Sequence, residues 1–103
     1  MIDEIALQRE ELATLCRRFH VRRLDLFGSA ARDDFDPKQS DIDFLVEFDH
    51  EHPDALSFKT YFDFKEALEA LLGRPVDLVE RGVVRNPYLR ASIDASRELV
   101  FEA

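Results

Sequence analysis

The chain has few of the residues that cross-link, kink or anchor a small protein. Its 103 residues include one cysteine, three glycines, four prolines and no tryptophan. The single cysteine, Cys16, excludes an internal disulfide and favours a reducing compartment, so we expect a cytoplasmic protein. No apolar run is long enough to cross a membrane. The acidic start, Met1 to Glu4, also lacks the basic and apolar regions of a secretion signal.

Positive charge is also scarce, with 14 basic residues against 22 acidic ones and a formal net charge of -8. Such a surface repels a phosphate backbone, so tight binding of nucleic acid is not expected. The charge does not exclude binding of a nucleotide through a bridging metal ion, because a bound cation inverts the local field. The length and the 46% hydrophobic content predict a single domain over residues 1–103 with one small core.

The pattern of apolar residues predicts alternating helices and strands. Helical periodicity covers residues 2–19, a stretch from residue 54 or 55 to Leu72, and Pro87 to about Ser96. Strand-like runs cover Val21 to Phe27, Ile42 to Phe48, Val76 to Glu80 and Leu99 to Phe101. This order predicts an α/β (α+β) domain, in which helices pack on a small mixed sheet of three to four strands.

Two carboxylates stand at the start of the clearest strand, Asp41 just before it and Asp43 within it. Residues two apart on a strand point to the same side, so these side chains project close together. Like charges raise each other's pKa unless a cation neutralises them, and Mg²⁺ binds carboxylates while leaving places for phosphate oxygens. Asp77 would join them if its strand neighbours that of Asp43. Three carboxylates can hold two metal ions.

A D-x-D sequence alone is a weak signal, because acidic residues at strand ends are commonly just solvated. Gly28 and Ser29 lie between an upstream strand and a short helical turn, and their presence favours a functional site over solvated surface acids. Glycine lets the backbone approach a ligand closely. A serine hydroxyl and the amides of a helix start can donate hydrogen bonds to phosphate oxygens. A phosphate cradle and a metal site joined by one loop predict a site for a nucleoside triphosphate.

The stretches GSAAR, residues 28–32, and SDIDFLVEF, residues 40–48, resemble the minimal nucleotidyltransferases of the DNA polymerase β superfamily. The signature of that family is a Gly-Ser turn, usually G-S-x-A-R-G, then S-D-x-D with a hydrophobic residue, and a third acidic residue on a later strand. The resemblance covers essentially the whole chain and implies the polymerase-β-like nucleotidyltransferase fold. It implies Asp41, Asp43 and Asp77 as catalytic ligands of Mg²⁺ or Mn²⁺, with Asp77 also helping to activate the attacking hydroxyl.

The same resemblance implies nucleotide-binding residues. Gly28 and Ser29 match the residues that contact the triphosphate. Arg32 matches the motif arginine that steadies a phosphate, and an ion pair with an acidic neighbour on the surface is an equal alternative. Ser40 is assigned to the nucleotide site, where it shapes the turn before Asp41.

Two departures from the family pattern fall in one loop. Asp33 stands where the family usually has glycine, and Asp34 follows it. Eleven residues separate Ser29 from Asp41, one more than is usual in the family. Extra negative charge near a triphosphate predicts weaker nucleotide binding, while the fold is unaffected.

The resemblance implies an enzyme that transfers a nucleoside monophosphate, expected to be AMP from ATP, to an acceptor and releases pyrophosphate. Minimal members of the family commonly pair with a small helical HEPN-type toxin, and some adenylylate that toxin. We therefore expect a HEPN-type partner whose hydroxyl accepts the nucleotide. The alternative is a binding module with weak or lost catalysis that neutralises its partner by complex formation. Homo-oligomer formation stays open.

The second long helix carries four aromatic residues within seven positions, Phe58, Tyr61, Phe62 and Phe64. This is a wider apolar surface than one face of a small sheet needs. We expect the sheet to cover most of them and one or two to contact a partner. The net charge of the chain favours a basic partner.

Overall fold

The computed structural model describes residues 1–32, 36, 41–53 and 57–103. Its helices are α1 (Asp3–Leu7), α2 (Arg9–Arg18), α3 (Ser29–Arg32), α4 (Phe58–Leu72) and α5 (Pro87–Ser96), with a 3₁₀ helix, η2, at Arg81–Val83. Its strands are β1 (Val21–Phe27), β2 (Ile42–Phe48), β3 (Val76–Glu80) and β4 (Glu98–Glu102). Within these ranges, every helix is too short or too polar to span a membrane.

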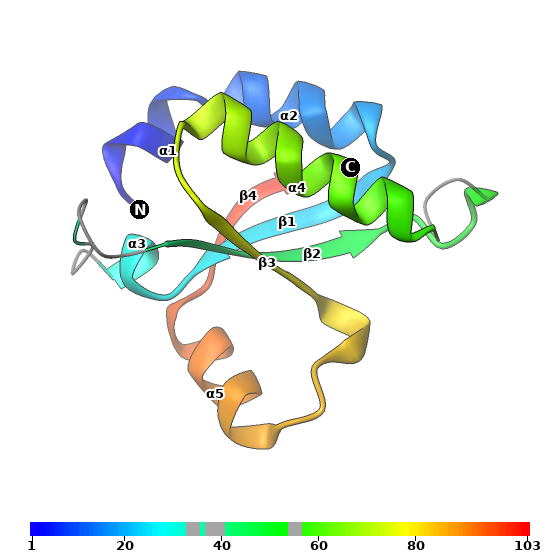
Figure 1. Ribbon diagram of the computed structural model, residues 1–103. Coiled ribbons are helices and arrows are strands. Elements are labelled where there is room, and N and C mark those ends of the chain that lie inside the picture. Colours follow the sequence, from blue (N-terminus) through cyan, green and yellow to red (C-terminus); the bar gives the residue numbers. More distant parts are fainter. Residues whose placement is uncertain (33–35, 37–40, 54–56) are drawn as a thin grey trace.

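The four strands form one mixed sheet in the order β3-β2-β1-β4. β1 runs antiparallel to both β2 and β4, whereas β3 runs parallel to β2. α4 makes the crossover that a parallel connection requires. Figure 1 shows α1, α2 and α4 on one face of the sheet and α5 on the other. The predicted α/β fold, a small mixed sheet with helices packed on it, is confirmed.

The larger hydrophobic core lies between the sheet and α1, α2 and α4. Alternate residues of β1 and β2 point into it, namely Leu24, Leu26, Ile42, Phe44 and Val46. α2 contributes Leu12 and Cys16, and α4 contributes Phe64 and Leu68, all fully buried. Burial raises the pKa of the Cys16 thiol to about 12, so Cys16 is a core residue with no reactive thiolate.

A smaller cluster lies on the opposite face, beneath α5. It consists of Phe27, Leu45 and Ile93, with Val79 and Val84 packed against it. In the described chain α5 is the one α-helix on this face, and it is ten residues long. Polar residues of β2 on this side, Asp43 and Glu47, therefore remain half-buried rather than sealed in a core. This face carries the candidate site.

The first helix departs from the sequence prediction. The apolar stripe predicts one helix over residues 2–19, which is wrong, because the chain leaves helical geometry at Gln8, with φ -108° and ψ 19°. The break lets two segments reach the core separately, α1 through Ile5 and α2 through Leu12. Ile2 anchors the first segment, since its amide donates to a carbonyl oxygen of α3 at 3.0 Å.

The second long helix begins at Phe58, while residues 54 and 55, the predicted start, lie outside the described residues. Ser57 caps the helix: its backbone is extended, and its hydroxyl oxygen accepts from the amide of Thr60 at 3.1 Å. The predicted end at Gly73 is confirmed. The backbone there is left-handed, with φ 66°, a conformation that favours glycine.

Candidate active site

Two of the predicted acidic residues lie side by side on neighbouring strands. Asp43 of β2 stands opposite Asp77 of β3 in the parallel register, and we call these two residues the acidic pair. In-register partners project to the same side of a sheet. Leu45, two residues after Asp43, packs with Ile93 of α5, so the acidic pair faces the side that carries α5. Asp41 precedes β2 by one residue and is exposed.

Asp43 is the electrostatic centre of this group. Its pKa is raised from 3.8 to about 6, first by burial and then by the neighbouring carboxylates of Asp77 and Asp41, whereas Arg32 lowers it. Three acidic groups therefore crowd a position that is poorly hydrated. This is an environment that a bound divalent cation relieves.

Gly28, at the end of β1, packs directly against Asp43. A Cβ atom at this position would overlap Oδ2 of Asp43, and the φ of 74° also disfavours a side chain. The Gly28 amide donates to Oγ of Ser96 at 3.1 Å. Glycine is thus required for the close approach to Asp43, and the turn is tied to the last residue of α5.

The rest of the Gly-Ser motif lies in the short helix α3. Ser29 begins this helix, and the amides of Ala31 and Arg32 both donate to the carbonyl oxygen of Gly28 at 3.1 Å. The positive charge of Arg32 acts on Asp43, so the motif arginine lies within electrostatic reach of the acidic pair. The structure therefore brings Gly28, Ser29 and Arg32 to the same end of the sheet as the acidic pair.

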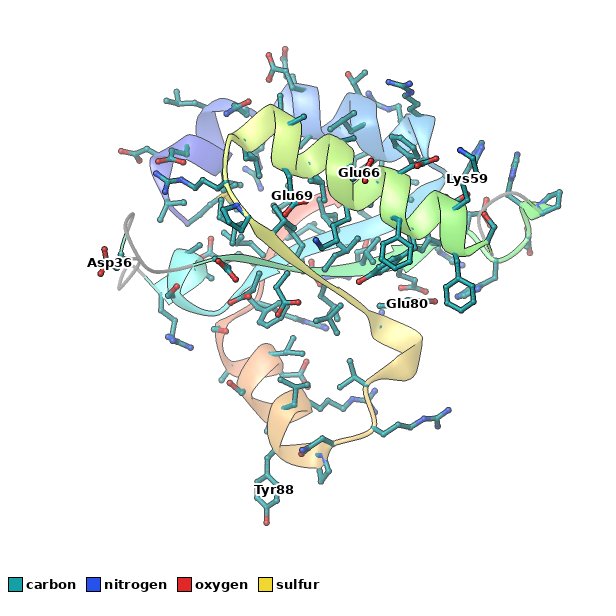
Figure 2. All side chains as sticks on the ribbon, in the orientation of Figure 1. Asp36, Lys59, Glu66, Glu69, Glu80 and Tyr88 are labelled. Carbon is teal, nitrogen blue, oxygen red and sulfur yellow. The ribbon has the colours of Figure 1, made fainter. Side chains whose placement is uncertain are left out.

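The loop between α3 and β2 is only partly described. Ser40, predicted to shape the turn before Asp41, lies outside the described residues, and so do Asp33 and Asp34. Their expected effects on nucleotide binding stay predictions. Asp36 is described and exposed, and Figure 2 shows it projecting from this loop.

The acidic pair fits a hard divalent cation. Mg²⁺ and Mn²⁺ bind carboxylate oxygens and keep other positions for water or phosphate oxygens. Asp43 and Asp77 supply such oxygens from adjacent strands. As the side chains stand, however, no three His, Cys, Asp or Glu residues among those described already surround a common point. The structure brings two carboxylates together, those of Asp43 and Asp77, and Asp41 would supply the third ligand of a bound cation.

Two features beside the acidic pair were not predicted from the sequence. One is the contact of Ser96 with Gly28, which depends on how α5 folds back over the sheet. The other is Asp25 of β1, which is only 1% exposed and accepts two hydrogen bonds from Nε of Arg23, at 3.1 and 3.2 Å. The available signal was the alternation in β1, which puts Asp25 on the face opposite the main core.

These features define the class of protein. A Gly-Ser turn packed against paired carboxylates, on a mixed sheet with helices, is the arrangement that the motifs of a nucleotidyltransferase predict. The family model for the nucleotidyltransferase domain matches residues 9–100, and the chain therefore belongs to this family.

Curated relatives place the chain more narrowly. It is 42% identical over 94 residues to a Methanocaldococcus jannaschii protein provisionally named a protein adenylyltransferase, covering 90% of this chain and 91% of that protein. It is 38% identical over 87 residues to the protein adenylyltransferase MntA of Thermococcus cleftensis, covering 84% and 80%. The chain is thus an enzyme of the nucleotidyltransferase class and a homologue of protein adenylyltransferases.

Solved structures agree with this placement. A structure provisionally described as a minimal nucleotidyltransferase is 34% identical, with a TM-score of 0.71 and coverage of 94% of this chain and 95% of that chain. The resemblance to minimal nucleotidyltransferases is therefore confirmed. A chain from a tri-AMPylated Shewanella oneidensis HEPN toxin in complex with an MNT antitoxin has a TM-score of 0.66 at 20% identity, covering 96% and 73%. That second likeness shows the shared fold.

Proposed function

We propose that this protein transfers AMP from ATP to a hydroxyl group of a partner protein, and that the partner is a HEPN-type toxin. The observation that carries the proposal is the acidic pair with Gly28 packed against it. The names of its curated relatives support adenylyl transfer to protein. The toxin–antitoxin complex that shares its fold supports a HEPN-type partner.

Asp43 and Asp77 would hold Mg²⁺ or Mn²⁺, with Asp41 as the third ligand. When bound, the metal supplies charge neutralisation for the triphosphate. Gly28 and Ser29 would position phosphate oxygens, and Arg32 would add positive charge beside them. The positions of these residues then determine which face of the α-phosphate is open to the attacking hydroxyl.

The acceptor hydroxyl attacks the α-phosphorus of ATP. A new bond forms between the hydroxyl oxygen and this phosphorus, while the bond to the bridging oxygen breaks and pyrophosphate leaves. The hydroxyl proton passes to a carboxylate oxygen of Asp77, which is exposed and therefore open to an incoming acceptor. Most of the rate enhancement comes from orientation and charge, since the residues form no covalent intermediate.

A protein acceptor suits the openness of this site. Asp41 and Asp77 are both exposed. A small acceptor would need an enclosed pocket for selectivity, whereas a protein brings its own surface and aligns its hydroxyl by docking. The proposal therefore assigns recognition of the acceptor to surfaces around the acidic pair.

A second candidate function is neutralisation of the partner by binding alone. The exposed aromatic residues of α4 favour it, because Phe58 is 85% and Phe62 56% exposed. Phe64 is buried, and the Tyr61 hydroxyl donates to the carbonyl oxygen of Leu78, so only the other two are available as anchors. Aromatic anchors are typical of interface cores. Binding and transfer are compatible in one protein.

The decisive experiment uses ATP labelled at the α-phosphate, Mg²⁺ or Mn²⁺, and a HEPN-type protein from the same cells. We expect label on the partner protein, and loss of transfer in Asp43→Asn. Glu66→Gln is the matched control, since Glu66 is an exposed acid of α4 (Figure 2) and should leave transfer unchanged. Complex formation without label would favour the binding module, and full activity of Asp43→Asn would contradict the assigned site.

A further inference from the structure

Charge is distributed unevenly along this acidic chain. Residues 81–97 contain four arginines and one aspartate, although the whole chain has a formal net charge of -8. This segment forms η2 and α5, which lie on the same side of the sheet as the acidic pair. The protein therefore presents a positive surface on the same side of the sheet as a negatively charged site.

A small pocket of about 120 Å³ lies within this segment and against β2. Its apolar part is formed by Leu45, Val84 and Ile93. Its charged part is formed by Arg81, Arg90 and Arg97, together with Asp94. A pocket of this composition suits a side chain with a short apolar stem and an anionic end.

Some of these arginines are already neutralised. Arg81 pairs with Glu47 at 3.0 Å and Arg97 with Asp94 at 3.4 Å. Arg90 and Arg85 are exposed, and neither pairs with a carboxylate in the parts of the chain that are described. Arg85 borders the same region, next to Arg81 and Arg90. We call Arg81, Arg85 and Arg90 the arginine surface.

The arginine surface lies on the same side of the sheet as the acidic pair but farther along β2. Arg81 pairs with Glu47, which follows Asp43 by four residues, a spacing of about 13 Å along a strand. Leu45, in the pocket, follows Asp43 by two residues on the same face of β2, a spacing of about 7 Å along a strand. Tyr88 and Leu89, at the start of α5, are 86% and 42% exposed. Figure 2 shows Tyr88 projecting away from the body of the protein. A protein that contacts these apolar side chains and the arginines would cover the same side of the sheet as the acidic pair.

Size and charge indicate the kind of occupant. Pockets for small ligands usually have volumes of about 300 Å³ or more, so the pocket of about 120 Å³ is too small for a nucleotide and suits one side chain. An extended nucleic acid would run from the arginine surface onto the acidic remainder of the chain, which repels it. A compact acidic group on a folded protein avoids this repulsion.

We propose that the arginine surface docks an acidic patch of the partner protein, with one Asp or Glu side chain of that partner in the pocket. The proposal rests on the proposed function in one respect, that the docked protein is the acceptor of the nucleotide. It differs from the expectation of a basic partner, which follows from the net charge alone. The net charge of the whole chain does not reveal this positive region, which lies on the same side of the sheet as the acidic pair.

The test measures binding of a fluorescein-labelled polyglutamate peptide by anisotropy, with polylysine and a single-stranded RNA oligonucleotide of similar length for comparison. We expect the peptide to bind the unmodified protein in a salt-sensitive manner. Arg85→Ala combined with Arg90→Ala should weaken this binding about tenfold. Arg18→Ala combined with Lys59→Ala removes two exposed charges from α2 and α4 and should change it less than about twofold. Thermal melting of both double variants verifies that they are folded.

Three results would overturn the proposal. They are equal peptide binding by both double variants, tighter binding of RNA that is lost with the same arginines, and a parallel loss of Mg²⁺–ATP affinity. Asp43→Asn separates this inference from the proposed function, because it should abolish transfer and leave peptide binding intact. Peptide binding through the arginines without any transfer to a HEPN-type protein would refute the proposed function and leave the docking surface standing.

Discussion

One face of the sheet is sealed by α1, α2 and α4, whereas in the described chain the other is covered only by α5 and the segment that leads into it from η2 (Figure 1). The sealed face buries Leu24, Ile42 and Phe44 against the helices. The open face has a small apolar cluster and, around it, charged side chains such as Asp43. Substitutions on the sealed face should therefore change stability, and those on the open face should change binding and transfer.

The sharpest test of the sealed face compares two aromatic residues of α4. Phe64 is fully buried, with its ring 5.6 Å from that of Phe19, whereas Phe62 is 56% exposed. Phe64→Ala should lower the free energy of unfolding by about 3 to 5 kcal/mol, because it leaves a cavity. Phe62→Ala should lower it by less than about 1 kcal/mol. Urea unfolding measures both, and equal costs would contradict the division of α4 into a buried and an exposed side.

Gly28→Ala should have the next largest effect on stability, and it should also reduce transfer. The new methyl group would collide with Asp43, and the left-handed backbone adds strain. Gly73→Ala is the matched control, since its φ is 66° but nothing lies within 4 Å. We expect about 1 to 2 kcal/mol from backbone strain in each variant and a further loss in Gly28→Ala alone. Displacement of Asp43 should also reduce transfer about 100-fold. Unfolding and transfer assays that fail to separate the two glycines would refute the close contact.

Asp43→Asn should have a smaller and opposite effect on metal-free stability. The folded-state pKa of Asp43, about 6, exceeds the ordinary value of 3.8, so the folded chain binds this proton more tightly than the unfolded chain. Stability is therefore lost as the pH rises through about 6. The substitution should stabilise the metal-free protein by about 1 to 2 kcal/mol at neutral pH, after allowance for solvent screening. Urea unfolding with a chelator, at pH 4.5 and pH 8, should show a clearly larger gain at the higher pH, because the loss of stability begins above pH 3.8 and is complete above about 6.

Ser96→Ala should have the smallest effect on stability and tests the link between α5 and the Gly-Ser turn. It removes the acceptor for the Gly28 amide, at a cost of about 1 kcal/mol or less. Because this bond holds the turn, we expect the KM for ATP to rise more than kcat falls. Ser92→Ala is the control, since Ser96 donates to the backbone oxygen of Ser92 and that bond survives. Identical kinetics for the two variants would show that the link is unimportant for nucleotide binding.

The strands and the two carboxylates of the D-x-D sequence were predictable because their signals are local. Alternation gave the bounds of β1, β2 and β3, and Asn86 followed by Pro87 marked the start of α5, where the Asn86 side chain caps two amides. The D-x-D sequence located Asp41 and Asp43. Placing Asp77 required the resemblance to a family, since the pairing of β2 with β3 is a long-range property.

Other features depend on tertiary contacts that local patterns do not encode. The break at Gln8 has no glycine or proline to announce it and follows from packing of two segments on one sheet. The hydrogen bond from Gly28 to Ser96 joins residues 68 positions apart. The arginine surface gathers residues from η2, the segment after it and α5, and its position on the same side of the sheet as the acidic pair emerges only from the fold.

The slight anchoring of α5 has an evolutionary consequence. Ile93 is the one residue of this helix that is buried, so most of its positions can be exchanged without opening a cavity. The residues proposed for chemistry lie earlier in the chain, from Gly28 to Asp77, on elements that the main core holds in place. Under the proposed docking, mutations at the exposed positions of α5 would alter which protein is recognised, provided that Ser96 is kept to hold the Gly-Ser turn. Lineages that carry this domain should diverge fastest along this helix as their partners change.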